Sequence, residues 1–358
     1  MIRKTTYKDN LNRLRHAVCA FGLLISLAAV PAYGQYVHQL SYNGSNWMDQ
    51  NLNGVPAQQS GIDAFVTTPN DQTHVYYLST LDTCHVHQLF YNGISWSDED
   101  LTALSGAVPA TSGSLISGFS VGNYQYVYYI GEEEDVHQLL YNNSGWTDTD
   151  LSSLTGGPIA TEELFAFTTG APAVHVYYVD YNDFHIHQLF SPDGSSWQDQ
   201  DLSGLTGGTT AAPASFMSGF NIDNFQYVYF VASNSHVHQF LYNNSSWSDR
   251  DLTALTKTLP VSQYGGVQAL VIPGTKKLRV YLGASNGHLL QLASSNGTTW
   301  SSMDLTKKAK APLADTSDQI AAFATTPDKA LHIFYVSDVG GGPTPGHIFE
   351  LTQPTAST

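Results

Sequence analysis

Glutamine and tryptophan residues recur along the chain in one short pattern. Runs of the type Val-His-Gln-Leu appear about every 50 residues, and each is followed by a polar pair such as Asn92-Gly93 and then by a tryptophan. The glutamines are Gln39, Gln88, Gln138, Gln188, Gln239 and Gln291, and the tryptophans are Trp47, Trp96, Trp146, Trp197, Trp247 and Trp300. An amide donates and accepts hydrogen bonds, and an indole offers a flat apolar face. Together they suit a saccharide, although repeated residues of this kind also pack one repeat against the next.

Histidines could supply metal ligands in three of the repeats. The pairs are His85 and His87, His185 and His187, and His236 and His238. Side chains alternate along a strand, so both imidazoles of such a pair lie on one face, as ligands of a metal ion would. Another repeat has Asp135 before His137 instead, and we expect no acid at a fixed offset to act as a third ligand. The sequence therefore predicts no metal site and no cofactor.

The acidic residues do not form a pattern typical of catalysis. A glycosidase needs two carboxylates that face each other, whereas the acids here either recur in pairs such as Asp98 and Asp100 or cluster at 132–135. We interpret the pairs as charges that prevent edge-to-edge pairing of an outer strand. A sialidase-like site needs three arginines, and only Arg250 and Arg279 follow residue 34. Because a Gly-x-Ser-x-Gly nucleophile elbow is also missing from the sequence, we predict that the protein is not an enzyme.

Four strands per repeat must position these side chains. Two β-rich runs, such as residues 64–66 and 74–77, precede each glutamine segment. The glutamine and tryptophan segments add a third and a fourth strand, joined by what we expect to be a two-residue type I′ turn. This pattern predicts an all-β, six-bladed β-propeller with four-stranded antiparallel blades. The chain begins with a third and a fourth strand and ends with a first, second and third, so we expect the two ends to close the ring. Seven blades, one of them incomplete, are the alternative.

The first 34 residues differ from the rest. Five basic residues precede an apolar run over 17–30, which predicts a signal peptide followed by one propeller domain over 35–358. The formal net charge is −16, and 9 basic against 29 acidic residues remain after residue 34. Such an acidic chain is unsuited to neutralising phosphates, so nucleic acid and anionic membranes are poor partners. The apolar run is also too short to favour a membrane-spanning helix, so we expect no membrane insertion. We expect a secreted protein, periplasmic or extracellular, and leave homo-oligomers open.

One repeat resembles those of the fungal fucose-specific lectins, which are six-bladed propellers. It contains Leu-Arg-Val-Tyr at 278–281, Gly-His-Leu-Leu-Gln-Leu at 287–292 and Asn-Gly-Thr-Thr-Trp at 296–300. The resemblance covers the chain from residue 35 onward, and seven-bladed bacterial propeller lectins are similar in a less specific way. In the fungal family a sugar lies between adjacent blades, held by an arginine of the second strand, a glutamate of the third and an aromatic ring of the neighbouring blade.

This resemblance implies carbohydrate-binding positions in several repeats. Arg279 matches the arginine of the family, and Gln291 stands beside it, with Trp247 or Trp300 as the stacking ring. The other positions are His332 with Glu350, His74 with Gln88, Gln138, and His175 with Gln188, and the further candidate stacking rings are Trp96, Trp146 and Trp197. We therefore predict a secreted lectin-like protein that binds neutral glycans, fucosylated ones among them, in the clefts between blades. The alternative is a non-catalytic propeller that serves as a protein-interaction or structural platform.

Overall fold

The computed structural model describes residues 36–42, 46–68, 72–170, 172–316, 320–324, 330–337 and 347–354. The chain falls into two compact units, residues 1–162 and 163–358. The expected signal peptide, residues 1–34, lies outside the described residues, and a single domain over 35–358 stays a prediction. Within the described ranges, no helix is both long enough and apolar enough to cross a membrane.

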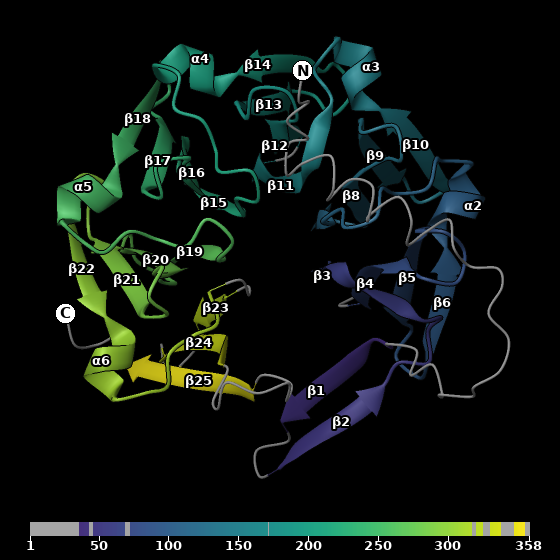
Figure 1. The fold of residues 1–358 in the computed structure, drawn as a ribbon. Helices are drawn as coiled ribbons and strands as arrows, with labels where there is room; N and C mark the ends of the chain where they lie inside the picture. Colours follow the sequence, from purple (N-terminus) through teal and green to yellow (C-terminus); the bar gives the residue numbers. More distant parts are fainter. Residues whose placement is uncertain are drawn as a thin grey trace, which may run out of the picture. The chain divides into compact units, whose positions relative to one another are not determined.

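Strands that follow one another in the sequence pair into antiparallel sheets (Figure 1). The first unit holds a two-stranded sheet of β1 (His38–Tyr42) and β2 (Trp47–Asn51). Its first four-stranded sheet consists of β3 (Ala57–Thr67), β4 (Gln72–Ser79), β5 (Val86–Tyr91) and β6 (Trp96–Asp100). The second consists of β7 (Ser117–Val121), β8 (Tyr124–Ile130), β9 (Val136–Tyr141) and β10 (Trp146–Asp150). The boundary between the units falls within the next strand, β11 (Ala160–Gly170).

The second unit continues the same order of strands. Its first four-stranded sheet consists of β11, β12 (Ala173–Asp180), β13 (Ile186–Ser191) and β14 (Gln198–Asp201), and its second of β15 (Met217–Ile222), β16 (Phe225–Val231), β17 (Val237–Tyr242) and β18 (Trp247–Asp251). The third consists of β19 (Val267–Val271), β20 (Leu278–Gly283), β21 (Leu289–Ser294) and β22 (Trp300–Asp304). A three-stranded sheet of β23 (Ala321–Ala324), β24 (Ala330–Ser337) and β25 (His347–Pro354) follows.

The second strand of a sheet is the most buried one. Six consecutive residues of β8, Gln125–Ile130, are buried, and β16 shows the same pattern. A strand covered on both faces needs apolar side chains on both, which explains runs such as Tyr-Val-Tyr-Tyr without alternation. The predicted four-stranded unit per repeat is confirmed, and the fold is an all-β, six-bladed β-propeller. Closure of the ring by the terminal strands stays a prediction.

Short helices follow the fourth strands, which the sequence interpretation missed. They are α2 (Leu101–Ser105), α3 (Leu151–Thr155), α4 (Leu202–Thr206), α5 (Leu252–Thr256) and α6 (Leu305–Ala309). The last aspartate of each fourth strand caps its helix: the Asp251 carboxylate, for example, accepts from the backbone N–H of Ala254. An Asx side chain at this position satisfies a helix-terminal N–H that would otherwise have no partner. These acids therefore have a capping role that the edge-protection interpretation did not foresee.

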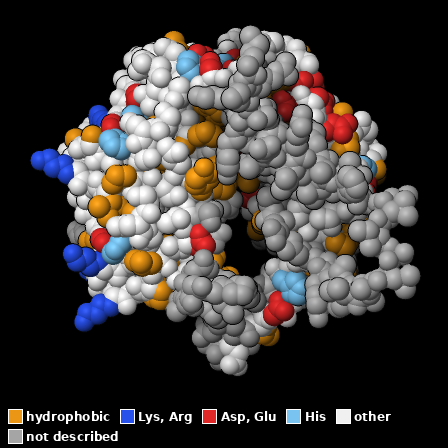
Figure 2. Space-filling view, in the orientation of Figure 1, with side chains coloured by type: hydrophobic (Ala, Val, Ile, Leu, Met, Phe, Trp, Pro, Cys, Tyr) orange, Lys and Arg blue, Asp and Glu red, His pale blue; other side chains and the backbone are white. Residues whose placement is uncertain are grey.

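The same aspartates also bind histidines of the third-strand segment. His85 Nδ1 lies 2.8 Å from Asp100 Oδ2, and His236 Nδ1 lies 2.6 Å from Asp251 Oδ2. Similar pairs join His185 to Asp201 and His288 to Asp304. In each pair the acid follows the histidine by 15 or 16 positions, so the expectation that no acid stands at a fixed offset is wrong. Figure 2 shows histidines beside carboxylates at the edge of the second unit, near α5 and α6.

The hairpin turns between third and fourth strands differ from the predicted type I′. That turn needs a positive φ at both central residues, but Asn244 has φ 72° whereas Ser245 is not among the residues with positive φ. Instead, the Asn243 side-chain oxygen accepts from the backbone N–H groups of Ser245 and Ser246. Because the asparagine side chain takes these two N–H groups, one left-handed residue is enough to reverse the chain.

Neighbouring sheets within each unit pack through a tyrosine and a tryptophan. The ring of Tyr177 on β12 meets Trp247 of β18 edge to face, with centroids 6.3 Å apart. The same contact joins Tyr229 to Trp300 at 6.0 Å, and Tyr76 to Trp146 at 6.3 Å. Each pair belongs to a hydrophobic cluster drawn from two sheets. The repeated tryptophans thus hold sheets together, whatever else they bind.

Candidate functional site

A pocket of about 520 Å³ opens between the β11–β14 and β15–β18 sheets of the second unit. This volume falls within the range of about 300–1,000 Å³ that is usual for small-molecule sites. The pocket is lined by His175, Gln188, Phe190, Gln198, Asp199, Gln200, Leu205, Gln226, Tyr242, Ser245, Ser246 and Trp247. Three residues that the sequence singled out, His175, Gln188 and Trp247, thus share one cavity.

Strand register explains how the two walls are assembled. Residues directly opposite each other on paired strands point to the same face of a sheet. On one wall His175 is paired with Phe190, and Phe190 with Gln198, so all three face the cavity. The opposite wall is a row on the next sheet, in which Gln226 is paired with Tyr242 and Tyr242 with Trp247.

The Gln188 side chain links both walls at the base of the pocket. Its Nε2 lies within hydrogen-bond distance of three atoms, His175 Nδ1 at 2.8 Å, Tyr177 Oη at 2.9 Å and Gln226 Oε1 at 3.0 Å, which share its two N–H groups. The Tyr177 hydroxyl in turn donates to Gln226 Oε1 at 2.6 Å. Buried amides and hydroxyls that satisfy one another in this way hold their donors and acceptors in fixed directions.

His175 is held neutral at this position. The imidazole is buried, its Nδ1 accepts from Gln188, and Nε2 lies 3.1 Å from Thr169 Oγ1. Burial lowers the pKa of His175 to about 4. Among the described residues, the lining therefore contains an uncharged imidazole, several amides and hydroxyls, and the carboxylate of Asp199. This set of groups suits a neutral polar ligand.

Aromatic and aliphatic groups complete the pocket. Phe190 stacks on His175 with ring centroids 4.9 Å apart, and Trp247 lies tilted against Tyr242 at 5.4 Å. Leu205 of α4 leaves 58% of its surface exposed although it is a large aliphatic residue. The cavity thus offers an indole and a leucine to apolar parts of a ligand and amides to its hydroxyls.

The first unit repeats this network between the β3–β6 and β7–β10 sheets. Gln88 Nε2 lies within hydrogen-bond distance of His74 Nδ1 at 2.7 Å, Tyr76 Oη at 2.9 Å and Gln125 Oε1 at 2.7 Å. The Tyr76 hydroxyl donates to Gln125, and Trp146 packs on Tyr76. Burial also lowers the pKa of His74 to about 4. His74, Gln88 and Trp146 therefore hold the positions that His175, Gln188 and Trp247 hold in the second unit.

The remaining predicted positions have other surroundings. Gln138 donates to Tyr128 at 2.8 Å, Trp96 packs on Tyr91 of its own hairpin, and Trp197 precedes β14. His332 Nδ1 lies 2.6 Å from Glu350 Oε1, so this pair does meet, and the imidazole stacks on Phe323.

The predicted grouping of Arg279 with Trp247 or Trp300 is not found. Arg279 is paired with Ala293, and Ala293 with Ser301, whereas Trp300 is one position away and faces the other side of its sheet. Trp300 packs on Tyr229 and Trp247 on Tyr177, each in the preceding sheet. Arg279 itself is 5% exposed, its Nη1 donates to the Leu278 carbonyl, and burial lowers its pKa.

Sequence reasoning missed Gln125 and Gln226, which complete the two networks. The repeats alternate between His-Val-Tyr-Tyr, at 74–77 and 175–178, and Gln-Tyr-Val-Tyr, at 125–128 and 226–229. This alternation places a histidine on one sheet opposite a glutamine on the next. A search for pairs of repeats, rather than single ones, would have found the two glutamines.

Comparisons with known proteins agree with this architecture. The family model described as fungal fucose-specific lectin matches residues 29–179. No curated protein sequence matches the chain. Among solved structures, a lectin of Burkholderia pseudomallei, BP39L, is similar with a TM-score of 0.61 and 15% identity over 88% of this chain and 86% of its own.

Two fungal proteins are similar in the same way. AofleA of Arthrobotrys oligospora has a TM-score of 0.54 and 14% identity, with 83% of each chain covered. The Aleuria aurantia lectin, described as a six-bladed β-propeller, has a TM-score of 0.51 and 17% identity over 83% of this chain and 96% of its own. Residues 29–179 thus match the fungal fucose-specific lectin family, as the repeats predicted, and the chain has the six-bladed β-propeller fold of the Aleuria aurantia lectin.

Proposed function

We propose that the protein is a lectin that binds a neutral sugar in the pocket lined by His175, Gln188 and Trp247. The observation that carries the proposal is the combination of a buried, uncharged hydrogen-bonding network with an indole wall in one cavity. Sugar hydroxyls can pair with such amides while C–H faces lie on the indole. Binding without catalysis fits a lining that holds one carboxylate rather than a facing pair.

An L-fucoside is the first ligand to test. The matched family is described as fucose-specific, and a mutant of the Aleuria aurantia lectin has been solved in complex with α-methyl-L-fucoside. In this chain the exposed Leu205 gives the pocket an apolar patch for the methyl group of a 6-deoxy sugar. The equivalent network at His74 and Gln88 would supply a second site, and two weak sites that engage one glycan surface reinforce each other.

We also propose that the protein is secreted, on the strength of the basic and apolar composition of residues 1–34. Mass spectrometry of protein recovered outside the cytoplasm should find an N-terminus at Gln35. An exported chain that still carries residues 1–34 would contradict this part of the proposal.

The ligand test uses the indole N–H signal of Trp247 in a two-dimensional NMR spectrum, assigned with a Trp247→Phe variant. We expect α-methyl-L-fucoside to shift this signal saturably, and methyl galactoside or mannoside to do so less or not at all. Leu205→Asp places a charge in the pocket and should weaken the response at least tenfold.

Leu255→Asp is the matched control, because Leu255 has the same place on α5 and is also half exposed. This variant should leave the response of Trp247 unchanged. If no sugar in the panel moves the Trp247 signal, the pocket is not a sugar site, and a protein-interaction platform becomes the better hypothesis.

A further inference from the structure

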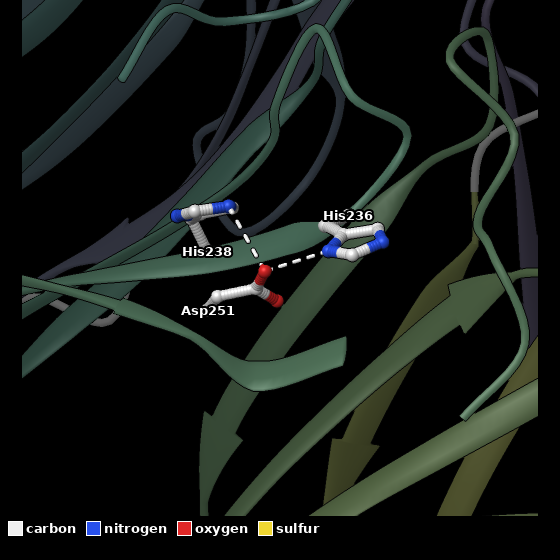
Figure 3. Close-up of side chains that lie close together, drawn as sticks. All are labelled: His236, His238 and Asp251. Carbon is white, nitrogen blue, oxygen red and sulfur yellow. Dashed lines mark hydrogen bonds and ion pairs between the residues drawn. The ribbon is translucent and has the colours of Figure 1, made fainter. Parts of the chain in front are cut away.

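Two histidines and an aspartate meet at the end of β17 and β18. His236 precedes β17, His238 lies in it, and Asp251 ends β18 directly opposite His238. Figure 3 shows both imidazoles turned toward the Asp251 carboxylate. His236 Nδ1 lies 2.6 Å from Asp251 Oδ2, and His238 Nε2 lies 3.8 Å from the same oxygen. One ligand atom from each residue falls within 4.8 Å of the other two.

His238 presents an unused nitrogen to this cluster. Its Nε2 is buried and has no hydrogen-bond partner among the described residues. Its Nδ1 lies 2.8 and 3.0 Å from the two carboxylate oxygens of Asp249, so this nitrogen already has a partner. A neutral imidazole whose second nitrogen bonds a carboxylate is the form in which histidine usually binds a metal ion. Nε2, the nitrogen without a hydrogen-bond partner in the part of the chain that the structure describes, is thus on the side of the ring that faces Asp251.

Asp251 is also oriented for ligation. Its Oδ1 accepts from the backbone N–H of Ala254 at 2.8 Å, which leaves Oδ2 facing both imidazoles. A tetrahedral Zn²⁺ with bonds of about 2.0–2.1 Å holds its ligand atoms about 3.4 Å apart. The two measured separations, 2.6 and 3.8 Å, lie on either side of that value. Side-chain shifts of less than about 1 Å would therefore give the geometry of a bound ion.

Other repeats fill the equivalent position with an acid. His87 Nε2 lies 2.8 Å from Asp82, and His137 Nε2 lies 3.2 Å from Glu133. In the loop before His236 the residues are Ala-Ser-Asn-Ser at 232–235, with no carboxylate. In the earlier repeats a carboxylate bonds Nε2 of the histidine, whereas Nε2 of His238 is left for another partner.

We propose that His236, His238 and Asp251 bind a divalent transition-metal ion, with Zn²⁺ as the ion of choice and a water molecule as the fourth ligand. Two imidazoles and one carboxylate suit Zn²⁺ better than calcium or magnesium, which prefer oxygen ligands. The side chains of His236 and Asp251 are 31% and 28% exposed, so an ion can enter from solvent. The ion would tie the segment before β17 to the end of β18, independently of the sugar pocket.

Calorimetric titration of the untagged protein with ZnCl₂ tests this site. We expect saturable binding of one ion with an affinity that falls at least tenfold in His236→Asn and in Asp251→Asn. Asparagine still caps α5 in the second variant, so the fold is preserved. Asp249→Asn removes the group that orients His238 and should weaken Zn²⁺ binding about 10–100-fold.

Asp201→Asn is the matched control. Asp201 caps α4 and bonds His185 as Asp251 does His236, but His185, His187 and Asp201 are not among the three-ligand groups of the described residues. This variant should bind Zn²⁺ like the wild type. Co²⁺ should give visible absorption bands of a tetrahedral complex in the wild type and lose them in His236→Asn.

Three results would overturn the proposal. The first is the absence of saturable Zn²⁺ binding. The second is wild-type affinity in a folded His236→Asn protein, with circular dichroism as the check of folding. The third is loss of Zn²⁺ binding in Asp100→Asn with full binding in Asp251→Asn, which would place the ion in the first unit.

Discussion

Acidification from pH 7 to pH 4 is expected to lower the free energy of unfolding by about 3 kcal/mol through His175 alone. The pKa of this buried imidazole is about 4 in the folded protein, against the ordinary value of 6.5. A lowered histidine pKa means that the fold prefers the neutral form. Its contribution is fully present above pH 6.5 and is lost as the pH falls from there toward pH 4.

A His175→Asn variant isolates this effect. The asparagine oxygen can accept from Gln188 in place of Nδ1, but it cannot gain a proton in this range. Urea unfolding at pH 7 and pH 4 should show a change in stability that is smaller by about 3 kcal/mol in the variant than in the wild type. Equal changes in the two proteins would mean that His175 is not held neutral by burial.

The difference between the two proteins is needed because other groups titrate in the same range. The pKa values of His87, His137 and His187 are raised by nearby aspartates despite their burial. Stability from a raised histidine pKa is present below pH 6.5 and is lost as the pH rises through the folded value. The contributions of these three histidines to the pH dependence of the free energy of unfolding are opposite in sign to that of His175. Because they are the same in the variant and the wild type, they cancel when the two proteins are compared.

Replacement of Gln188 by methionine is expected to destabilise the protein by about 1–3 kcal/mol. Methionine fills a similar volume, so little of this cost comes from packing. The buried His175 Nδ1 would lose its hydrogen-bond donor, and Gln226 Oε1 would lose one of its two donors and keep the Tyr177 hydroxyl. An unsatisfied buried acceptor carries the full penalty of its lost hydration. The Trp247 response to a bound sugar should disappear as well.

Gln291→Met is the matched control for this substitution. Gln291 occupies the same strand position and is as buried as Gln188, but its Oε1 and the Tyr281 hydroxyl opposite it have no hydrogen-bond partner among the described residues. Its replacement should cost less than that of Gln188 by at least about 1 kcal/mol in denaturant unfolding. Equal costs at the two positions would show that the Gln188 network does not stabilise the fold.

Repeats made the strands predictable from the sequence. The period of about 50 residues, the two β-rich runs and the Asn-Gly-type pairs are local features, and each strand lies where they placed it. The short helices were missed because each is only five residues long. Each helix is signalled only by an aspartate followed by a leucine at the end of a strand. Without the structure, such an aspartate cannot be told from a charge that protects the edge of a sheet.

The sequence by itself determined which side chains of one strand share a face, because side chains alternate with a period of two along every strand. His175 and Gln188, which the resemblance to the lectin family grouped, meet through a hydrogen bond, as do His74 and Gln88, although the residue paired with Gln188 across the hairpin is Tyr177. The tertiary structure alone decided which tryptophan completes each cleft. Trp300 and Arg279 belong to one sheet but to opposite faces, and Trp247 comes to His175 from the next sheet. Packing between sheets joins residues that are far apart in the sequence, such as Tyr177 and Trp247, and no local periodicity encodes the face on which two sheets meet.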